Sequence, residues 1–342
     1  MKYVIAVGFH KLGETVNQTK SAKGGAKKIL CEHNSFLKTT HIFWRREIYK
    51  PFVIVAPSQD ILQKNRVYFR WHFMHVTETG ADTMFRRRRW LACLVGDHRS
   101  VEEARQLNLD QLAEKCLRSS THTVDQIDID VPRSGVVLKE EKLSLRRVLM
   151  AWCALNEFGY VQGMNLIAAA LLKYMREGRY PEHDALACLS GVMALNAGLL
   201  PFHMEDEEPM KLASVVVSKM WLQVSVVEPS LQQQLLQILD LFEIACLRIM
   251  SVCFVTFFSP DTLHVVWDYV FENDDSADDK TSSRCRHVFS SAVLLQKKLW
   301  LFGEDAKQNF VIFEATCGLM DEQQIVKIVD LAKYLERLEK YN

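Results

Sequence analysis

The 342-residue chain lacks the features that identify several large classes of protein. It contains no GxxxxGK[ST] phosphate-binding loop, so we do not expect it to bind GTP itself. Lys+Arg and Asp+Glu both total 42, and the formal net charge is zero. This balance gives no support for a general nucleic-acid or anionic-membrane binder, which would need a net basic surface.

Long apolar runs and paired cysteines are also missing. The longest apolar candidate, roughly residues 235–258, is interrupted by Asp240, Glu243 and Arg248, which rules against a lipid-exposed span. The apolar stretch after Met1 is too short for a signal peptide. The nine cysteines are scattered without a CxxC pair, as expected for buried free thiols in a reducing compartment. We therefore predict a cytoplasmic protein without a membrane span.

Two groups of side chains only superficially resemble metal sites. His72 and His75 would point to opposite faces of a strand, and no cysteine or carboxylate completes a set. Asp125, Asp128 and Asp130 lack the glycine and the distal glutamate of a calcium loop. No metal ion or other cofactor is expected.

The chain divides into two regions of different texture. Residues 1–83 contain β-branched and aromatic runs, such as residues 52–55 and 66–71, and a Lys/Gly/Ser-rich stretch at 20–28. This pattern indicates a partly loop-like segment of some β character, to which the sequence assigns no role.

From about residue 84 to 336 the pattern is helical, and residues 337–342 form a short tail. Leu143–Leu155 places four apolar residues on one face, Ser100–Glu103 has the spacing of a capping box, and Pro181 and Pro229 each open an apolar run. Further helical patterns cover 212–224, 263–271, 289–301 and 323–338, whereas the polar segment 273–286 is predicted to be a mobile surface loop. Strand signals are nearly absent, so we predict an all-α array of many helices without a repeat.

Two short segments each contain one side chain of a type that can assist phosphate hydrolysis. The first runs from Ile127 through Asp130 to Arg133, and the second is Tyr160-Val161-Gln162-Gly163. An arginine can neutralise charge on phosphoryl oxygens, and a glutamine can orient an attacking water. Taken alone, each is more often an ordinary loop or helix-start residue, so residue type does not assign the chemistry.

In this order the two segments, IxxDxxR and YxQG, resemble the signatures of the TBC domain of Rab GTPase-activating proteins. Supporting similarities cover roughly residues 84–335: Arg86 with Trp90 resembles an early RxxxW helix, Asn156 precedes the second segment, and Phe258-Ser259 with Trp267-Asp268 resembles a later FS…WD stretch. Beside Trp90, the run Arg86–Arg89 is better interpreted as a helix face with one structural arginine than as a nuclear signal or a nucleic-acid patch.

The resemblance implies an all-α fold of two helical subdomains and a dual-finger mechanism. Arg133 would stabilise charge at the γ-phosphate of a GTP-bound Rab, and Gln162 would orient the water. Asp130 would hold Arg133, Ile127 and Tyr160 would anchor their loops, and Gly163 would allow the chain to bend. GTP and Mg²⁺ would be carried by the partner GTPase.

The sequence departs from the family pattern near both landmarks. Ser134 stands where a threonine usually follows the arginine, and Gly135-Val136-Val137 replaces the aromatic or proline positions. Cys253 or a neighbour stands where a tryptophan commonly precedes the FS landmark. We expect these changes to affect the choice of partner and the efficiency more than the type of reaction.

Two hypotheses follow. In the first, the chain activates a Rab-type GTPase in trans and has no hydrolase activity of its own. In the second, it is a weak or inactive TBC-fold scaffold that binds a Rab. The intact Arg133 and Gln162 favour the first. Any association with endomembranes would be peripheral and would depend on the partner.

Overall fold

The computed structural model describes residues 80–96, 98–156, 159–195, 208–237, 245–246, 248–272, 280–302 and 305–340. These residues form fourteen α-helices and one 3₁₀ helix, and no strand occurs among them. The predicted all-α fold is confirmed. The β-like runs expected before residue 80 lie outside the described residues.

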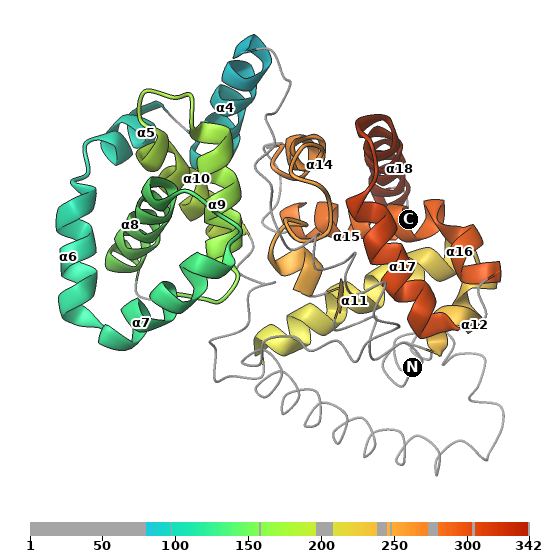
Figure 1. The fold of residues 1–342 in the computed structure, drawn as a ribbon. Coiled ribbons are helices and arrows are strands. Elements are labelled where there is room, and N and C mark those ends of the chain that lie inside the picture. The colour runs from blue at the N-terminus through green and yellow to red at the C-terminus, as the bar shows by residue number, and fades with distance from the viewer. Residues whose placement is uncertain are drawn as a thin grey trace.

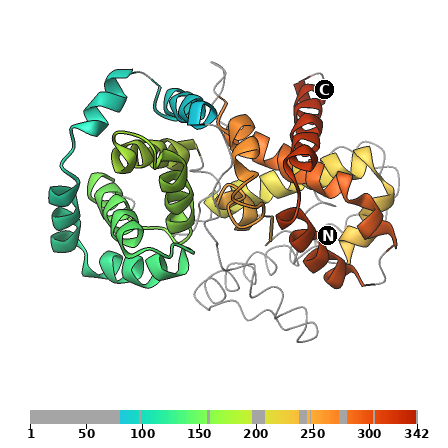
Figure 2. The ribbon, with the colours of Figure 1, turned by 45° about the horizontal axis from the view of Figure 1, so that its top comes forward.

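The helices form two groups that lie side by side (Figures 1 and 2). The first group contains α4 (Gly80–Val95), α5 (His98–Arg105), α6 (Leu109–Ser119), α7 (Thr121–Asp130), η1 (Val131–Arg133), α8 (Lys139–Leu155), α9 (Met164–Met175) and α10 (Pro181–Leu195). The second contains α11 (Glu208–Val227), α12 (Ser230–Leu236), α14 (Leu263–Val270), α15 (Lys280–Leu295), α16 (Lys297–Phe302), α17 (Ala306–Gly318) and α18 (Glu322–Lys340). We call them the N-terminal and C-terminal subdomains.

Helix α8 lies inside the N-terminal subdomain, packed against α6, α7, α9 and α10 (Figure 1). Its predicted apolar face is fully buried and consists of Leu145, Val148, Leu149 and Trp152. Two arginines lie between Leu145 and Val148 in the sequence. Arg146 binds Asp128 of α7 at 2.6 Å, and Arg147 binds Asp110 of α6 at 2.8 Å. The helix therefore fixes the position of α7, which carries the first motif.

None of the described helices is long and apolar enough to cross a membrane.

Several helix boundaries differ from those predicted from the sequence. The capping-box prediction was wrong, because α5 begins at His98 and Glu103 instead pairs with Arg99 at 2.9 Å. Pro181 is the first residue of α10 as predicted, whereas Pro229 lies just before α12. The pattern at 289–301 is divided at Gln296 between α15 and α16.

The prediction of a surface loop at 273–286 was wrong for its last seven residues. They form the first two turns of α15, and Arg284 and Arg286 are buried there. Arg284 donates to the Glu272 carbonyl, and Arg286 binds the Glu339 carboxylate. Polar residues normally indicate solvent, but these are compensated by partners that the local sequence does not show.

His287 belongs to the same buried cluster. Its Nε2 lies 2.8 Å from Glu339 Oε2, and Nδ1 has no hydrogen-bond partner among the described residues. This arrangement fits a neutral ring that donates from Nε2. Burial first, and the Arg286 guanidinium second, lower the pKa of His287 from its usual 6.5 to about 4.

We predict that this histidine makes the protein acid-sensitive. Between pH 6.5 and 4 the unfolded chain binds a proton at His287 while the folded chain does not, so the unfolding free energy falls as pH falls. The total loss is about 3 kcal/mol. Urea denaturation across this range measures it, and His287→Asn should flatten the pH dependence. His98→Asn, at an exposed histidine, is the control. Equal slopes for His287→Asn and wild type would contradict the assignment.

Helices α4 and α10 approach each other closely at Gly191. A Cβ built on Gly191 would lie 2.3 Å from the Leu94 carbonyl oxygen, which is backbone and cannot rotate away. Only glycine therefore permits this helix contact.

Gly191→Ala should consequently lower the unfolding free energy by about 1–3 kcal/mol, the usual cost of overpacking. Chemical denaturation measures the loss. Ser190→Ala, at the preceding position of the same helix, keeps the existing Cβ and should change stability by less than about 1 kcal/mol. Equal effects of the two substitutions would show that the α4–α10 contact is not tight.

Candidate functional site

The arginine segment begins where α7 ends. Helix α7 passes into the single 3₁₀ turn of η1, which contains Pro132, and Arg133 is its last residue. The Arg133 side chain is 59% exposed, and its Nη1 lies 3.4 Å from Asp130 Oδ1. One long hydrogen bond on an exposed guanidinium leaves most of its five donors available to another molecule.

Asp130 is buried, with 2% of its surface exposed. Its Oδ2 accepts hydrogen bonds from Tyr160 OH and from Gln126 Nε2, both at 3.1 Å, while Oδ1 faces Arg133. Burial first, and the charge of Asp130 second, raise the pKa of Tyr160, so its hydroxyl remains a donor. Three donors thus compensate the buried carboxylate.

The glutamine segment is a tight bend that leads into α9. Gly159 and Gly163 adopt left-handed φ values of 68° and 102°. Val161 and Gly163 are buried, whereas Gln162 between them is partly exposed. The bend therefore leaves the glutamine side chain accessible while its two neighbours anchor the backbone.

The structure brings the two segments together. The Tyr160 hydroxyl bonds to Asp130, and the buried Asn165 in the first turn of α9 donates to both the Asp130 carbonyl and the Ser134 hydroxyl. Ile127, the first residue of the IxxDxxR pattern, lies in α7 and is completely buried. The arginine segment and the glutamine segment are therefore parts of one hydrogen-bonded unit.

Asn165 was not predicted as a site residue. A signal for it existed, because it is the one polar residue in the first nine positions of α9, a stretch of otherwise apolar residues. Buried amides in such positions almost always have specific hydrogen-bond partners. What the sequence could not supply was the identity of those partners, which lie more than thirty residues away.

The C-terminal subdomain supports the glutamine segment. A Cβ on Gly163 would lie 2.9 Å from Val252 Cγ1. The bend that follows Val252 holds Cys253 and Phe254 at φ values of 49° and 65°, and the Cys253 carbonyl accepts a hydrogen bond from Trp267 Nε1 at 2.8 Å. Cys253, which lies in the region where a tryptophan was expected, is buried.

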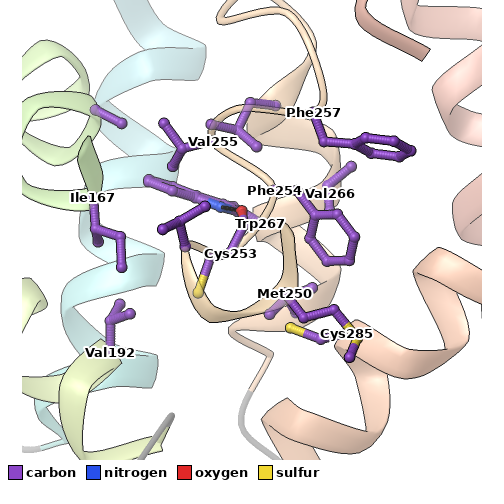
Figure 3. Close-up of a cluster of buried hydrophobic side chains, with 14 of the residues drawn as sticks. Ile167, Val192, Met250, Cys253, Phe254, Val255, Phe257, Val266, Trp267 and Cys285 are labelled. Carbon is purple, nitrogen blue, oxygen red and sulfur yellow. Dashed lines mark hydrogen bonds between the residues drawn. The ribbon is translucent and has the colours of Figure 1, made fainter. Parts of the chain in front are cut away.

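Figure 3 shows this bend facing the N-terminal subdomain, with Ile167 of α9 and Val192 of α10 opposite Cys253 and Trp267. All four side chains are buried. The segment that supports Gly163 is therefore part of the hydrophobic contact between the two subdomains.

Arg86 and Trp90 lie at that contact. Arg86 Nε and Trp90 Nε1 donate to the two carboxylate oxygens of Asp268 in α14, at 3.1 and 2.8 Å. The Trp90 ring also meets the Trp267 ring edge to face, with centroids 5.4 Å apart. The RxxxW and WD landmarks thus contact each other directly. Ile127 and Asp130, by contrast, lie on the arginine segment, and Tyr160 and Gly163 lie on the glutamine segment.

The three acidic residues before Arg133 lie in different environments. Asp125 is exposed, Asp128 pairs with Arg146, and Asp130 points into the buried network. No group of three or more His, Cys, Asp or Glu side chains in the described part of the chain is arranged to hold a metal ion.

The family model described as the Rab-GTPase-TBC domain matches residues 83–298 of this chain. The chain belongs to this family. The fold of this chain is similar to the crystal structure of the Chlamydomonas flagellar RabGAP TBC domain. The two chains share 16% sequence identity, the match covers 88% of this chain and 92% of that chain, and the TM-score is 0.54. At this identity the likeness shows the fold. No curated protein matches the chain.

Membership in the TBC family implies a Rab GTPase as the partner of this domain. The position of the two motifs agrees with a site that acts on another molecule. Arg133 is exposed and Gln162 partly exposed, while the residues that hold them are buried.

The TBC domain's dependence on Gly163 can be tested by substitution. Gly163→Ala should lower the unfolding free energy by about 2 kcal/mol, because the new Cβ would occupy a left-handed conformation and collide with Val252. Urea denaturation measures this loss. The double variant with Val252→Ala should recover the steric part and keep the conformational part. Strict additivity of the two single losses would show that Gly163 and Val252 do not contact each other.

Proposed function

We propose that this TBC domain accelerates GTP hydrolysis by a Rab-type GTPase in its GTP-bound form, with Arg133 and Gln162 as the catalytic residues. The observation that carries the proposal is the union of the two finger segments around Asp130, Tyr160 and Asn165, with both finger side chains left accessible. Two solvated loop residues without a shared role would not require buried bonds between their segments.

Arg133 supplies positive charge. In phosphoryl transfer, negative charge spreads over the γ-phosphate oxygens in the transition state, and a guanidinium stabilises it most strongly where water is excluded. The hydrogen bond from Nη1 to Asp130 holds one corner of the guanidinium. The remaining donors stay available for the phosphate.

Gln162 supplies an amide. An amide both donates and accepts hydrogen bonds, so it can accept from an attacking water while it donates to a phosphate oxygen. The buried neighbours Val161 and Gly163 fix the backbone on either side. A GTPase that provides its own glutamine would then not need it for this reaction.

The nucleotide and Mg²⁺ would arrive with the GTPase, so the domain contributes residues in trans and performs no hydrolysis alone. We place the domain at residues 84–336. Its end lies beyond the family match, which stops at residue 298, because α18 packs on α14 and α15; this helix itself continues to Lys340. Residues 1–83 remain without an assigned role. The protein would act in the cytoplasm and reach endomembranes through its Rab.

The test is a single-turnover hydrolysis assay over a panel of GTP-loaded Rabs. Arg133→Ala should reduce the stimulated rate by about 10³–10⁵, and Gln162→Ala should also cause a large loss. Gln162→Ala should unfold at about the wild-type temperature, because this side chain is partly exposed. Arg133→Ala removes one of the three donors to the buried Asp130 and should unfold somewhat lower, so its rate is measured at a temperature where the variant is fully folded.

Arg99→Ala is the matched control. Arg99 is an exposed arginine of α5 with its own carboxylate partner, Glu103, and its loss should leave the rate unchanged. If wild-type protein binds a Rab but stimulates none, the scaffold alternative holds. Full activity of both finger variants would refute the catalytic assignment.

A further inference from the structure

Asn165 is the residue through which the two finger segments are joined most directly. It lies in the first turn of α9 and is 5% exposed. Its Nδ2 donates to the Asp130 carbonyl oxygen at 3.2 Å and to Ser134 Oγ at 2.9 Å, and its Oδ1 accepts from the Gly163 amide at 3.2 Å.

The orientation of this amide is fixed by its partners. A backbone carbonyl only accepts hydrogen bonds, so the atom facing Asp130 must be the nitrogen. A backbone N–H only donates, so the atom facing Gly163 must be the oxygen. A flipped amide would lose both bonds, which leaves one arrangement for the side chain.

The hydrogen bonds of Asn165 reach residues close in sequence to both Arg133 and Gln162. On one side they hold the residues three before and one after Arg133, where Ser134 Oγ also donates back to the Asp130 carbonyl at 3.1 Å. On the other side they hold the residue directly after Gln162. A single rigid side chain therefore connects the backbone around Arg133 with the backbone beside Gln162.

We propose that Asn165 is a positioning residue that sets the separation between Arg133 and Gln162. The inference rests on the proposed function, since only a reaction that uses both side chains at once depends on their separation. This positioning role requires a side chain of fixed length that carries both a hydrogen-bond donor and an acceptor. Aspartate keeps the acceptor but has no donor for Asp130 and Ser134, and alanine has neither.

The functional test compares Asn165→Asp and Asn165→Ala with wild type on a Rab that wild type stimulates. A misplacement of about 1 Å can cost on the order of 10² in rate. We expect kcat to fall about 30–100-fold, with the Kd for the GTP-loaded Rab changed less than about threefold, because the contact surface remains. Unchanged kcat in both variants would overturn the inference while the proposed function stands.

Ser134 provides a milder variant that retains the fold. Ser134→Ala removes one acceptor of Asn165 and should lower kcat, whereas Ser134→Thr keeps the hydroxyl and should restore it. Gly191→Ala is the control for lost stability, because it loosens the α4–α10 contact away from these bonds. A fall in kcat for Gly191→Ala as large as that for Asn165→Ala would assign the effect to general destabilisation and overturn the positioning role.

Amide hydrogen exchange on the free protein tests the same claim without a GTPase. Asn165→Ala should speed exchange in residues 131–137 and at Gly163 together. Asn165→Asp should speed exchange in residues 131–137 but spare Gly163, whose acceptor it retains. Unchanged exchange in residues 131–137 in both variants would overturn the proposal even if no Rab were stimulated by wild-type protein.

Discussion

The candidate site depends on the burial of the Asp130 carboxylate. A buried charge without partners costs several kcal/mol, so the fold is stable only when donors converge on it. Those donors come from α7, from Arg133 itself and from Tyr160 of the glutamine segment. Folding of the N-terminal subdomain therefore assembles the two segments at the same time. The exposed ends of Arg133 and Gln162 are consequences of this buried arrangement.

A second constraint comes from the contact between the subdomains. Asp268 receives both Arg86 and Trp90, and Trp267 holds the carbonyl of Cys253 in a bend with two left-handed non-glycine residues. Such backbone persists only where the surroundings determine it. Because Val252 in this bend packs against Gly163, the position of Gln162 depends on both subdomains.

Sequence patterns predicted those parts of the structure whose conformation is determined by residues close together in the chain. The apolar spacing of Leu145, Val148 and Leu149 predicted α8, and the IxxDxxR and YxQG patterns picked out two segments that the structure joins by a buried hydrogen bond. Partners distant in the chain were missed. Asn165 bonds to residues 31 and 35 positions away, and Arg286 bonds to Glu339, 53 positions away. The polarity of Arg286 therefore suggested solvent, although its partner makes it a core residue.

With Gln162 as the water-orienting residue, the domain would bring its own glutamine to the reaction. The most direct measurement uses a Rab, stimulated by the wild-type domain, whose own water-orienting glutamine has been replaced by alanine. We expect the wild-type domain still to accelerate hydrolysis by this Rab to nearly the same rate, and Gln162→Ala to abolish the acceleration. Loss of stimulation by the wild-type domain would rule out this role of Gln162, because it would show that the GTPase, and not Gln162, orients the water.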